Sequence, residues 1–229
     1  MKDLRGTYVH RGDVERRKRR ARAVVMMVGL GTAGIMAAQN WAPIDANAEP
    51  VQRTVAQRAE VQLLANRIER TRSELSVADL QLERWDHIFS FSRRFHVEAG
   101  LSAKVYDAAV GAGIDPELAF PLVRLESEFK SNAVSSAGAL GLTQLMIATA
   151  RFYQKDISRE ELLKPEVNLR IGFRYLRDLI RQHRDVQLAL LAYNRGPAAV
   201  ENARELGMDP SNGYDRIVLK RYRGKGIID

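Results

Sequence analysis

The stretch DPELAFPLVRLESEF, residues 115–129, combines the start signal of a helix with an apolar face. Asp115 can cap the helix, and Pro116 suits its first position, where the N–H that proline lacks would have no partner. Apolar residues recur at helical spacing, at Leu118, Leu122, Leu125 and Phe129. The stretch therefore predicts a core-facing helix that carries Glu126 in its last turn.

Two glutamates, Glu126 and Glu128, stand near the end of this helix. They lie two positions apart, which is roughly 200° around a helix, so at most one of them faces the core. We interpret Glu126, which follows Leu125, as the buried one and Glu128 as solvated. Burial disfavours the charged form of a carboxyl and raises its pKa, so a buried glutamate can deliver a proton near neutral pH. Glu126 is therefore the candidate general acid.

Helical patterns continue through the C-terminal half of the chain. A helix capped by Ser102 is expected to run to Ala112, where Gly113 closes it. Further helices are predicted at residues 142–153, 165–183, 186–193, 197–206 and 214–221. No convincing strand alternation is present, although a short hairpin within residues 131–139 stays open as an alternative. The predicted fold class is all-α.

Three motifs follow one another with helical sequence between them: Glu126-Ser127-Glu128-Phe129, Gly141-Leu142-Thr143-Gln144-Leu145-Met146 and Ala192-Tyr193-Asn194-Arg195-Gly196-Pro197. In this order they resemble the soluble lytic transglycosylase (SLT) family, which cleaves peptidoglycan and has a lysozyme-like helical fold. The resemblance covers about residues 101–222 and implies a catalytic domain at residues 101–229.

The resemblance implies a role for individual residues. Glu126 takes the position of the family's single acid/base. Six further residues are expected to bind or orient the substrate: Ser127, Ser135, Gln144, Tyr175, Tyr193 and Asn194. In the family the tyrosine of the A-Y-N motif reaches the catalytic carboxyl, so the hydroxyl of Tyr193 is expected on Glu126. The sequence departs from the family at Thr143, where methionine is common, and at Ile147, where proline is usual.

The family's chemistry is non-hydrolytic. An ordinary glycosidase uses two carboxylates, and these motifs offer no obvious partner for Glu126. The resemblance implies a glycan lyase that cuts the β-1,4 bond between N-acetylmuramic acid and N-acetylglucosamine and leaves 1,6-anhydro ends. Two alternatives stay open: a lysozyme-like muramidase that uses water, and a non-catalytic module that binds peptidoglycan or acts as a scaffold. No cofactor or metal is indicated, since the four histidines have no ligand-like spacing.

The net charge of +8 is concentrated at the N-terminus. Residues 1–22 carry nine basic and three acidic residues, a net +6, so the remainder carries only +2. This distribution argues against nucleic acid as a general partner. The chain has no cysteine, which excludes disulfides, a thiol nucleophile and a lipoprotein anchor.

The basic segment is followed by an uncharged, mostly apolar run and by the small-residue site Ala46-Asn47-Ala48. This layout is typical of a secretory signal peptide. Residues 1–48 therefore predict export to the periplasm or cell envelope, with cleavage after Ala48 or retention as an inner-membrane signal-anchor. The alternative is that residues 16–22 form a nucleic-acid arm on a cytosolic protein.

Residues 49–98 predict a long helical stalk, which Gly100 ends. Apolar or small residues alternate at spacings of three and four, at Val61, Leu64, Ile68, Thr71, Leu75, Ala78, Leu82, Trp85 and Phe89. Such a seam is typical of a coiled coil, so residues 51–97 are a possible surface for self-association or a protein partner. The favoured alternative is a helix packed along its own catalytic domain, with Trp85, Phe89, Phe91 and Phe95 docking onto it.

Overall fold

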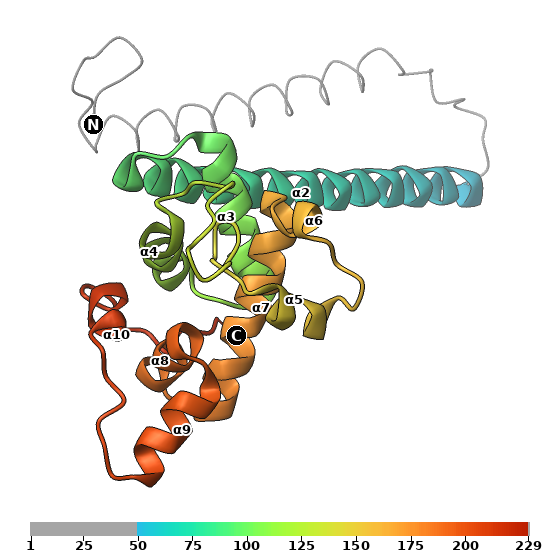
Figure 1. The fold of residues 1–229 in the computed structure, drawn as a ribbon. Helices are drawn as coiled ribbons and strands as arrows, with labels where there is room; N and C mark the ends of the chain where they lie inside the picture. The colour runs from blue at the N-terminus through green and yellow to red at the C-terminus, as the bar shows by residue number, and fades with distance from the viewer. Residues whose placement is uncertain (1–49, 229) are drawn as a thin grey trace. The chain divides into compact units, whose positions relative to one another are not determined.

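The computed structural model describes residues 50–228. The chain divides into two compact units, residues 1–71 and 72–229. The described residues contain isolated β-bridges but no named strand, which confirms the all-α class. The helices, drawn in Figure 1, are α2 (Pro50–Phe95), α3 (Ala99–Ala112), α4 (Pro116–Ser127), α5 (Ile147–Tyr153), α6 (Arg159–Leu162), α7 (Pro165–His183), α8 (Val186–Arg195), α9 (Pro197–Glu205) and α10 (Tyr214–Val218).

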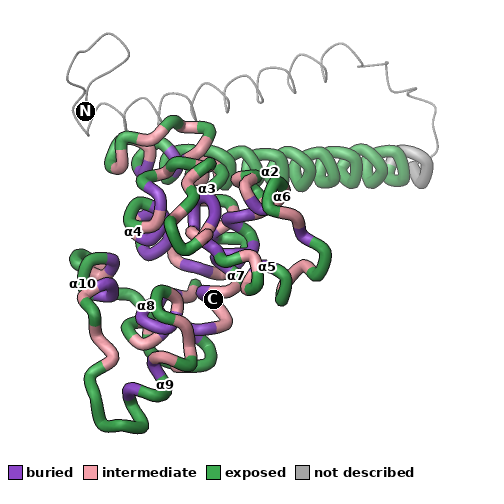
Figure 2. The backbone as a smooth tube through the Cα atoms, viewed as in Figure 1, coloured by how far each residue is buried: buried purple, intermediate pink, exposed green. Residues whose placement is uncertain are grey.

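The main core lies where α3, α4, α7 and α8 pack together (Figure 2). Leu118 and Leu122 of the predicted apolar face are completely buried there, together with Phe173 of α7. Leu125, also predicted for that face, is exposed. The buried face of α4 is therefore narrower in its last turn than at its start. A smaller cluster of buried side chains lies around α5 and α6, made of Leu140, Leu145, Ala150, Ile157, Leu162 and Ile171.

The junction between α3 and α4 follows the sequence signals. Gly113 closes α3 in the left-handed conformation, at φ 70°, as glycine does without steric cost. Asp115 caps α4 by accepting a hydrogen bond from the backbone N–H of Glu117 at 2.9 Å. The predicted start of α3 is wrong: the helix begins at Ala99, and the hydroxyl of Ser102 inside it donates to the carbonyl of Ile88.

Residues 142–145 are also not helical, although the pattern predicted a helix from residue 142. They belong to a turn in which Leu140 and Leu145 exchange backbone hydrogen bonds at 2.9 and 3.0 Å. Another isolated bridge joins Val134 to Leu140, in the segment for which a hairpin was the alternative, but no named strand forms among the described residues there. Helix α5 starts only at Ile147. Ile147 thus occupies the first helical position, which is one that proline favours.

The end of α2 packs onto α4 through two of the four aromatic residues predicted to dock, Phe91 and Phe95. Ile88 and Phe91 are buried, and the ring of Phe91 stacks on Phe120 of α4 with centroids 4.2 Å apart. Trp85 and Phe89, which were predicted to dock, are exposed. Within residues 72–95 the apolar seam therefore faces solvent, which contradicts the expectation that it packs along the chain's own domain.

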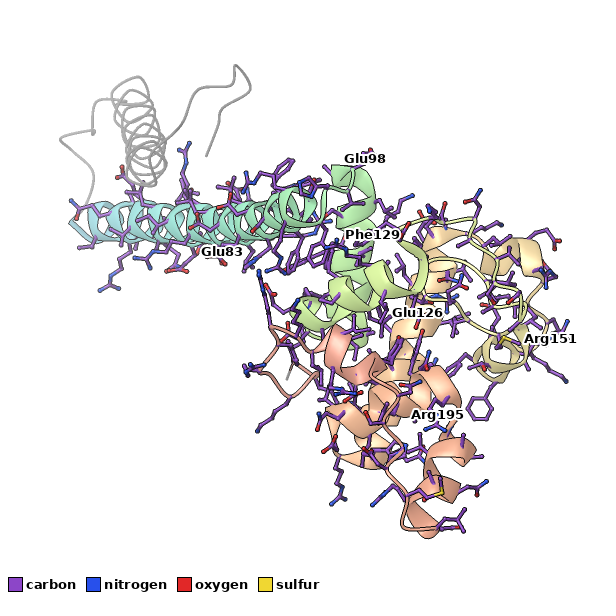
Figure 3. The ribbon with its side chains drawn as sticks, turned by 60° about the vertical axis from the view of Figure 1, so that its left-hand side comes forward. Glu83, Glu98, Glu126, Phe129, Arg151 and Arg195 are labelled. Carbon is purple, nitrogen blue, oxygen red and sulfur yellow. The ribbon has the colours of Figure 1, made fainter. Side chains whose placement is uncertain are left out.

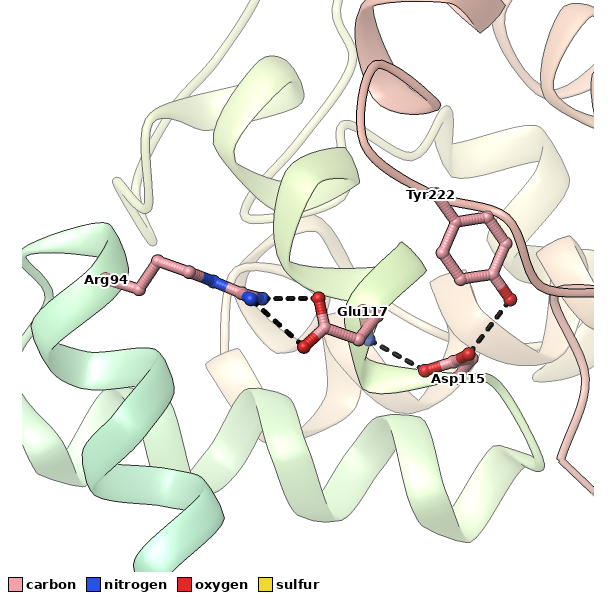
Figure 4. Close-up of polar contacts among 4 residues, drawn as sticks. All are labelled: Arg94, Asp115, Glu117 and Tyr222. Carbon is pink, nitrogen blue, oxygen red and sulfur yellow. Dashed lines mark hydrogen bonds and ion pairs between the residues drawn. The ribbon is translucent and has the colours of Figure 1, made fainter. Parts of the chain in front are cut away.

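The start of α4 is held from two further directions (Figure 4). Arg94 of α2 forms two hydrogen bonds with the carboxylate of Glu117, at 3.0 and 2.7 Å. The hydroxyl of Tyr222, near the C-terminal end, donates to the second oxygen of Asp115 at 3.0 Å. The same hydroxyl accepts from the N–H of Gly226, whose carbonyl accepts from the N–H of Asp115. The C-terminal segment thus anchors the helix that carries Glu126.

Candidate active site

Glu126 lies in the last turn of α4, where Figure 3 labels it. The helix ends directly beyond it because Glu128 and Phe129 adopt left-handed backbone conformations, at φ 51° and 62°. The two glutamates consequently meet different surroundings. Glu126 is half-buried, whereas the side chain of Glu128 is 75% exposed and pairs with Lys130 at 2.8 Å. The prediction that Glu126 is the buried one is confirmed.

The environment of Glu126 suits proton transfer. Burial raises the pKa of its carboxyl from 4.5 to about 7, and a hydrogen bond from Tyr214 partly opposes this rise. Such a group is present in both protonation states near neutral pH, which is what a residue that first gives and then takes a proton requires.

The hydroxyl of Tyr214 donates to Oε1 of Glu126, and this contact was not predicted. Tyr214 is buried at the first position of α10, and both burial and the charge of Glu126 raise its pKa well above 10. The phenol therefore stays protonated and remains a hydrogen-bond donor near neutral pH. The sequence offered only a helix start at Tyr214, with no motif around it to indicate a role.

Tyr193, for which this contact was predicted, binds elsewhere. Its hydroxyl donates to the carbonyl of Thr143 at 2.8 Å. The pKa of Tyr193 is raised well above 10, first by burial and next by the charge of Glu126, so the ring lies within electrostatic reach of the acid. The structure thus corrects the expected hydrogen bond: Tyr214 holds the carboxyl, and Tyr193 holds the neighbouring turn.

The turn at residues 140–145 is fixed to α7 by one buried amide. Asn168 accepts from the backbone N–H of Thr143 at 2.8 Å and from its hydroxyl at 2.7 Å. The amide nitrogen of Asn168 donates to the carbonyls of Leu140 at 2.9 Å and Leu162 at 3.0 Å. All four hydrogen-bonding positions of this side chain are filled, as a fully buried amide requires.

Two glycines allow this close approach. A Cβ on Gly141 would overlap the side chain of Asn168, and a Cβ on Gly172 would overlap the side chain of Thr143. Ser127, next to the acid, donates to the carbonyl of Leu142 at 2.9 Å. The turn is therefore tied to α4 by Ser127, to α7 by Asn168 and to α8 by Tyr193.

This arrangement lies within a region that matches a known family. Residues 105–212 match the family model described as the transglycosylase SLT domain. This region is an SLT domain. Its bounds include Glu126 and the turn at residues 140–145, while Tyr214 lies just beyond the matched region.

Relatives of the SLT domain carry related names. The chain is 29% identical over 168 residues to membrane-bound lytic murein transglycosylase F of Vibrio parahaemolyticus, covering 67% of this chain and 28% of that protein. It is 33% identical over 123 residues to soluble lytic murein transglycosylase of Escherichia coli K12, covering 51% of this chain and 18% of that protein. Among solved structures it is similar to the 70 kDa soluble lytic transglycosylase of Escherichia coli, with 27% identity and a TM-score of 0.48, over 56% of this chain and 24% of the other. The chain thus spans less than a third of the length of these relatives.

Two further predicted site residues of the SLT domain lie in this turn, at Gln144, and in the loop before it, at Ser135. The side-chain amide of Gln144 donates to the carbonyl of Gly141 at 2.9 Å, from a left-handed backbone at φ 46°. The hydroxyl of Ser135 accepts from the N–H of Ala139 at 3.0 Å and closes the preceding loop. These contacts fix the side chains of both residues.

Tyr175 and Asn194 approach the site from the helices α7 and α8. The ring of Tyr175 lies 5.2 Å from that of Tyr193, measured between centroids, and burial raises its pKa. Asn194 accepts a hydrogen bond from the side chain of Asn212 at 2.8 Å, and Asn212 in turn accepts from the backbone N–H of Tyr214 at 3.1 Å. Asn194 is therefore connected to the residue that holds Glu126. Among residues 50–228 no cluster of histidine and carboxylate side chains is arranged to bind a metal ion.

Proposed function

We propose that this chain is a lytic transglycosylase that cleaves the β-1,4 bond between N-acetylmuramic acid and N-acetylglucosamine in peptidoglycan. The observation that carries the proposal is the half-buried carboxyl of Glu126, with a pKa of about 7 and a hydrogen bond from Tyr214. The names of the relatives support the same substrate and reaction.

In the proposed reaction Glu126 starts protonated and gives its proton to the glycosidic oxygen as the bond to the anomeric carbon of the muramic acid breaks. Positive charge then develops on the sugar ring, next to the new carboxylate. The C6 hydroxyl of the same sugar attacks the anomeric carbon, and Glu126 takes the hydroxyl proton. The acid is restored, and the strand ends in a 1,6-anhydro sugar.

Tyr214 supports both stages because its hydroxyl orients one carboxylate oxygen and stabilises the charge that appears after proton donation. The turn at residues 140–145 supplies a rigid wall beside the acid. We propose that Ser127 and Tyr193 act by positioning this wall. We assign Ser135, Gln144, Tyr175 and Asn194 to binding or orienting the glycan.

The test compares two isosteric variants of neighbouring glutamates. Glu126→Gln keeps the shape of the side chain and removes the proton, so cleavage should fall by about 10²–10⁴-fold or more. Glu128→Gln changes an exposed residue outside the site and should stay active. Mass spectrometry of the released fragments should show anhydro ends. Reducing ends would instead identify a muramidase, and full activity of Glu126→Gln would refute the assignment.

We further propose that peptidoglycan strands are the substrate and that residues 1–48 direct export to the periplasm or cell envelope, with inner-membrane association if the segment is retained. The basic and apolar layout of that segment supports this, and it lies outside the described residues. None of the helices within residues 50–228 is long and apolar enough to cross a membrane. The relative from Vibrio parahaemolyticus is named as membrane-bound.

A further inference from the structure

Within the unit of residues 72–229, a cleft lies between the end of α7, the start of α8 and the segment that follows α10. Its volume is about 840 Å³, and its lining residues fall within residues 180–187 and 219–227. The cleft lies at the start of α8, whereas Tyr193 and Asn194 lie at the end of that helix. None of its lining residues is assigned to catalysis or to binding the glycan, so the cleft is separate from the proposed active site.

Four cationic residues line this cleft. Arg181 and Arg184 stand at the end of α7, and Arg223 and Lys225 stand in the C-terminal segment. The acidic residue among the described lining residues, Asp185, caps α8 by accepting from a backbone N–H of that helix at 2.9 Å. Within residues 50–228 none of the four cations forms an ion pair. Four cations and one acid give the lining a net charge of +3, and this charge has no ion-pair partner there.

Helix stability alone does not explain this cluster. Basic residues at the end of a helix offset the negative end of its dipole, which accounts for Arg181 and Arg184 but not for Arg223 and Lys225, which lie outside any helix. Arg184 adopts the left-handed conformation, at φ 53°, where glycine is usual and less strained. Like charges that line one cleft repel one another until an anion neutralises them. The cluster is therefore better explained by a bound anion.

The C-terminal wall of the cleft is held in place by the chain itself. Gly226 packs so closely that an added Cβ would lie 2.9 Å from the side chain of Ile180 and 3.1 Å from that of Val186. Its N–H donates to the hydroxyl of Tyr222 at 2.7 Å. One guanidinium nitrogen of Arg223 donates to the carbonyl of Tyr222 at 2.8 Å, which orients its charged group. A ligand therefore meets a wall that is already ordered, and the entropy cost of binding is lower.

The lining indicates the chemical class of the ligand. Beside the cations it contains the apolar residues Ile180, Leu219 and Ile227. A phosphate monoester carries nearly two negative charges at neutral pH and three strong acceptor oxygens, which match guanidinium groups better than a single carboxylate does. We propose that this cleft binds a phosphate monoester whose attached group is apolar. The phosphate contacts the arginines, and the attached group contacts the apolar residues. A small soluble molecule and the headgroup of a lipid can both supply this chemistry.

The first experiment titrates the full chain with hexyl phosphate in a calorimeter. Saturable binding of one molecule per chain is expected, tighter than that of inorganic phosphate, which lacks the apolar group, and of hexanoate, which lacks the phosphate. Absence of saturable binding would overturn the proposal, and so would equal affinity for either of the two comparison compounds. Cosedimentation with phosphatidylcholine vesicles that contain phosphatidic acid identifies the source. Vesicle binding that is weakened by Arg181→Gln would support a lipid headgroup, and binding of hexyl phosphate alone would support a soluble ligand.

The second experiment compares two arginine variants in the same titration. Arg181→Gln should weaken the binding of hexyl phosphate by about tenfold or more, since it removes a hydrogen bond between charged groups. Arg204→Gln is the matched control, because both arginines are exposed in the last turn of a helix and Arg204 lies outside the cleft. This variant should bind as the unmodified chain does. Equal losses in the two variants would indicate a general effect of charge and refute the site. Glu126→Gln should bind normally, so this test does not depend on the proposed cleavage activity.

Discussion

At the end of α4, two identical side chains two positions apart acquire opposite properties from their surroundings. Burial raises the pKa of Glu126 to about 7, while the hydrogen bond and charge of Lys130 lower the pKa of Glu128. The left-handed residues that terminate the helix turn Glu128 into solvent. The position at which the helix ends thus determines which of the two glutamates has a raised pKa.

Removing the hydroxyl of Tyr214 should change the pH dependence of cleavage. The hydrogen bond lowers the pKa of Glu126, so Tyr214→Phe should raise this pKa above about 7. Because the reaction starts from the protonated acid, the decline of activity at high pH should move to higher pH, and maximal turnover should fall. The pH profile of fragment release measures both effects.

Tyr193→Phe provides the control for this shift, because the hydroxyl of Tyr193 binds Thr143 and not the acid. It should reduce turnover by loosening the turn at residues 140–145 while leaving the position of the high-pH decline nearly unchanged. If only Tyr193→Phe moved the decline, the assignment of the two tyrosines would be reversed.

The raised pKa of Glu126 should also make the stability of the fold depend on pH. Between the usual value of 4.5 and about 7, the unfolded chain releases this proton while the folded chain keeps it. Stability should therefore fall as pH rises through that window, by roughly 3 kcal/mol at most. Urea unfolding of the unmodified chain and of Glu126→Gln, at pH 4.5 and 7.5, isolates this contribution. A difference between the two proteins that does not change with pH would contradict it.

Among the elements, the turn at residues 140–145 is the one whose shape depends most on its neighbours. It makes no regular helix or strand, and it is held by side chains from α4, α7 and α8: Ser127, Asn168 and Tyr193. Gly172 on α7 leaves the space that the side chain of Thr143 occupies. Changes in the packing of α7 should therefore reach the site through this turn.

A pair of glycine substitutions tests this dependence. Gly172→Ala should displace Thr143 and lower both the melting temperature and turnover, because the added Cβ has no room. Gly111→Ala, inside α3, adds a Cβ with no atom within 4 Å and should stabilise the protein by up to about 1 kcal/mol. Thermal unfolding and cleavage assays compare the two. Equal melting temperatures would mean that α7 and the turn separate at little cost.

For the molecule as a whole, sequence patterns predicted what is local. The bounds of α7 at residues 165–183 agree with the prediction because a proline start and an apolar face mark it, and the cap at Asp115 is equally local. The contact between Tyr214 and Glu126 joins residues 88 positions apart, which no spacing rule can connect. The exposure of Trp85 was not predicted for a related reason. An apolar seam on a helix has the same sequence pattern whether or not another part of the chain packs against it.

Export is a property of the whole chain and can be tested directly. Residues 1–50 fused to a reporter that is active only outside the cytoplasm should give signal, because a basic head and an apolar run direct export. N-terminal sequencing of the exported full chain should then give a start at Glu49 or an intact anchor. Absence of signal would mean that the fusion stays in the cytoplasm. This outcome would favour the interpretation of residues 16–22 as a nucleic-acid arm.

The hydrogen bond between Tyr222 and Asp115 has a consequence for the order of assembly. It joins residues 107 positions apart in the sequence. The hydrogen bond between Glu126 and Tyr214 likewise forms only after a late part of the chain is present. A chain emerging from the ribosome or a translocation channel exposes Glu126 long before its partner arrives. Until residue 214 has emerged, the carboxyl of Glu126 lacks its hydrogen-bond donor, so the proposed cleavage activity should appear only after Tyr214 has been delivered.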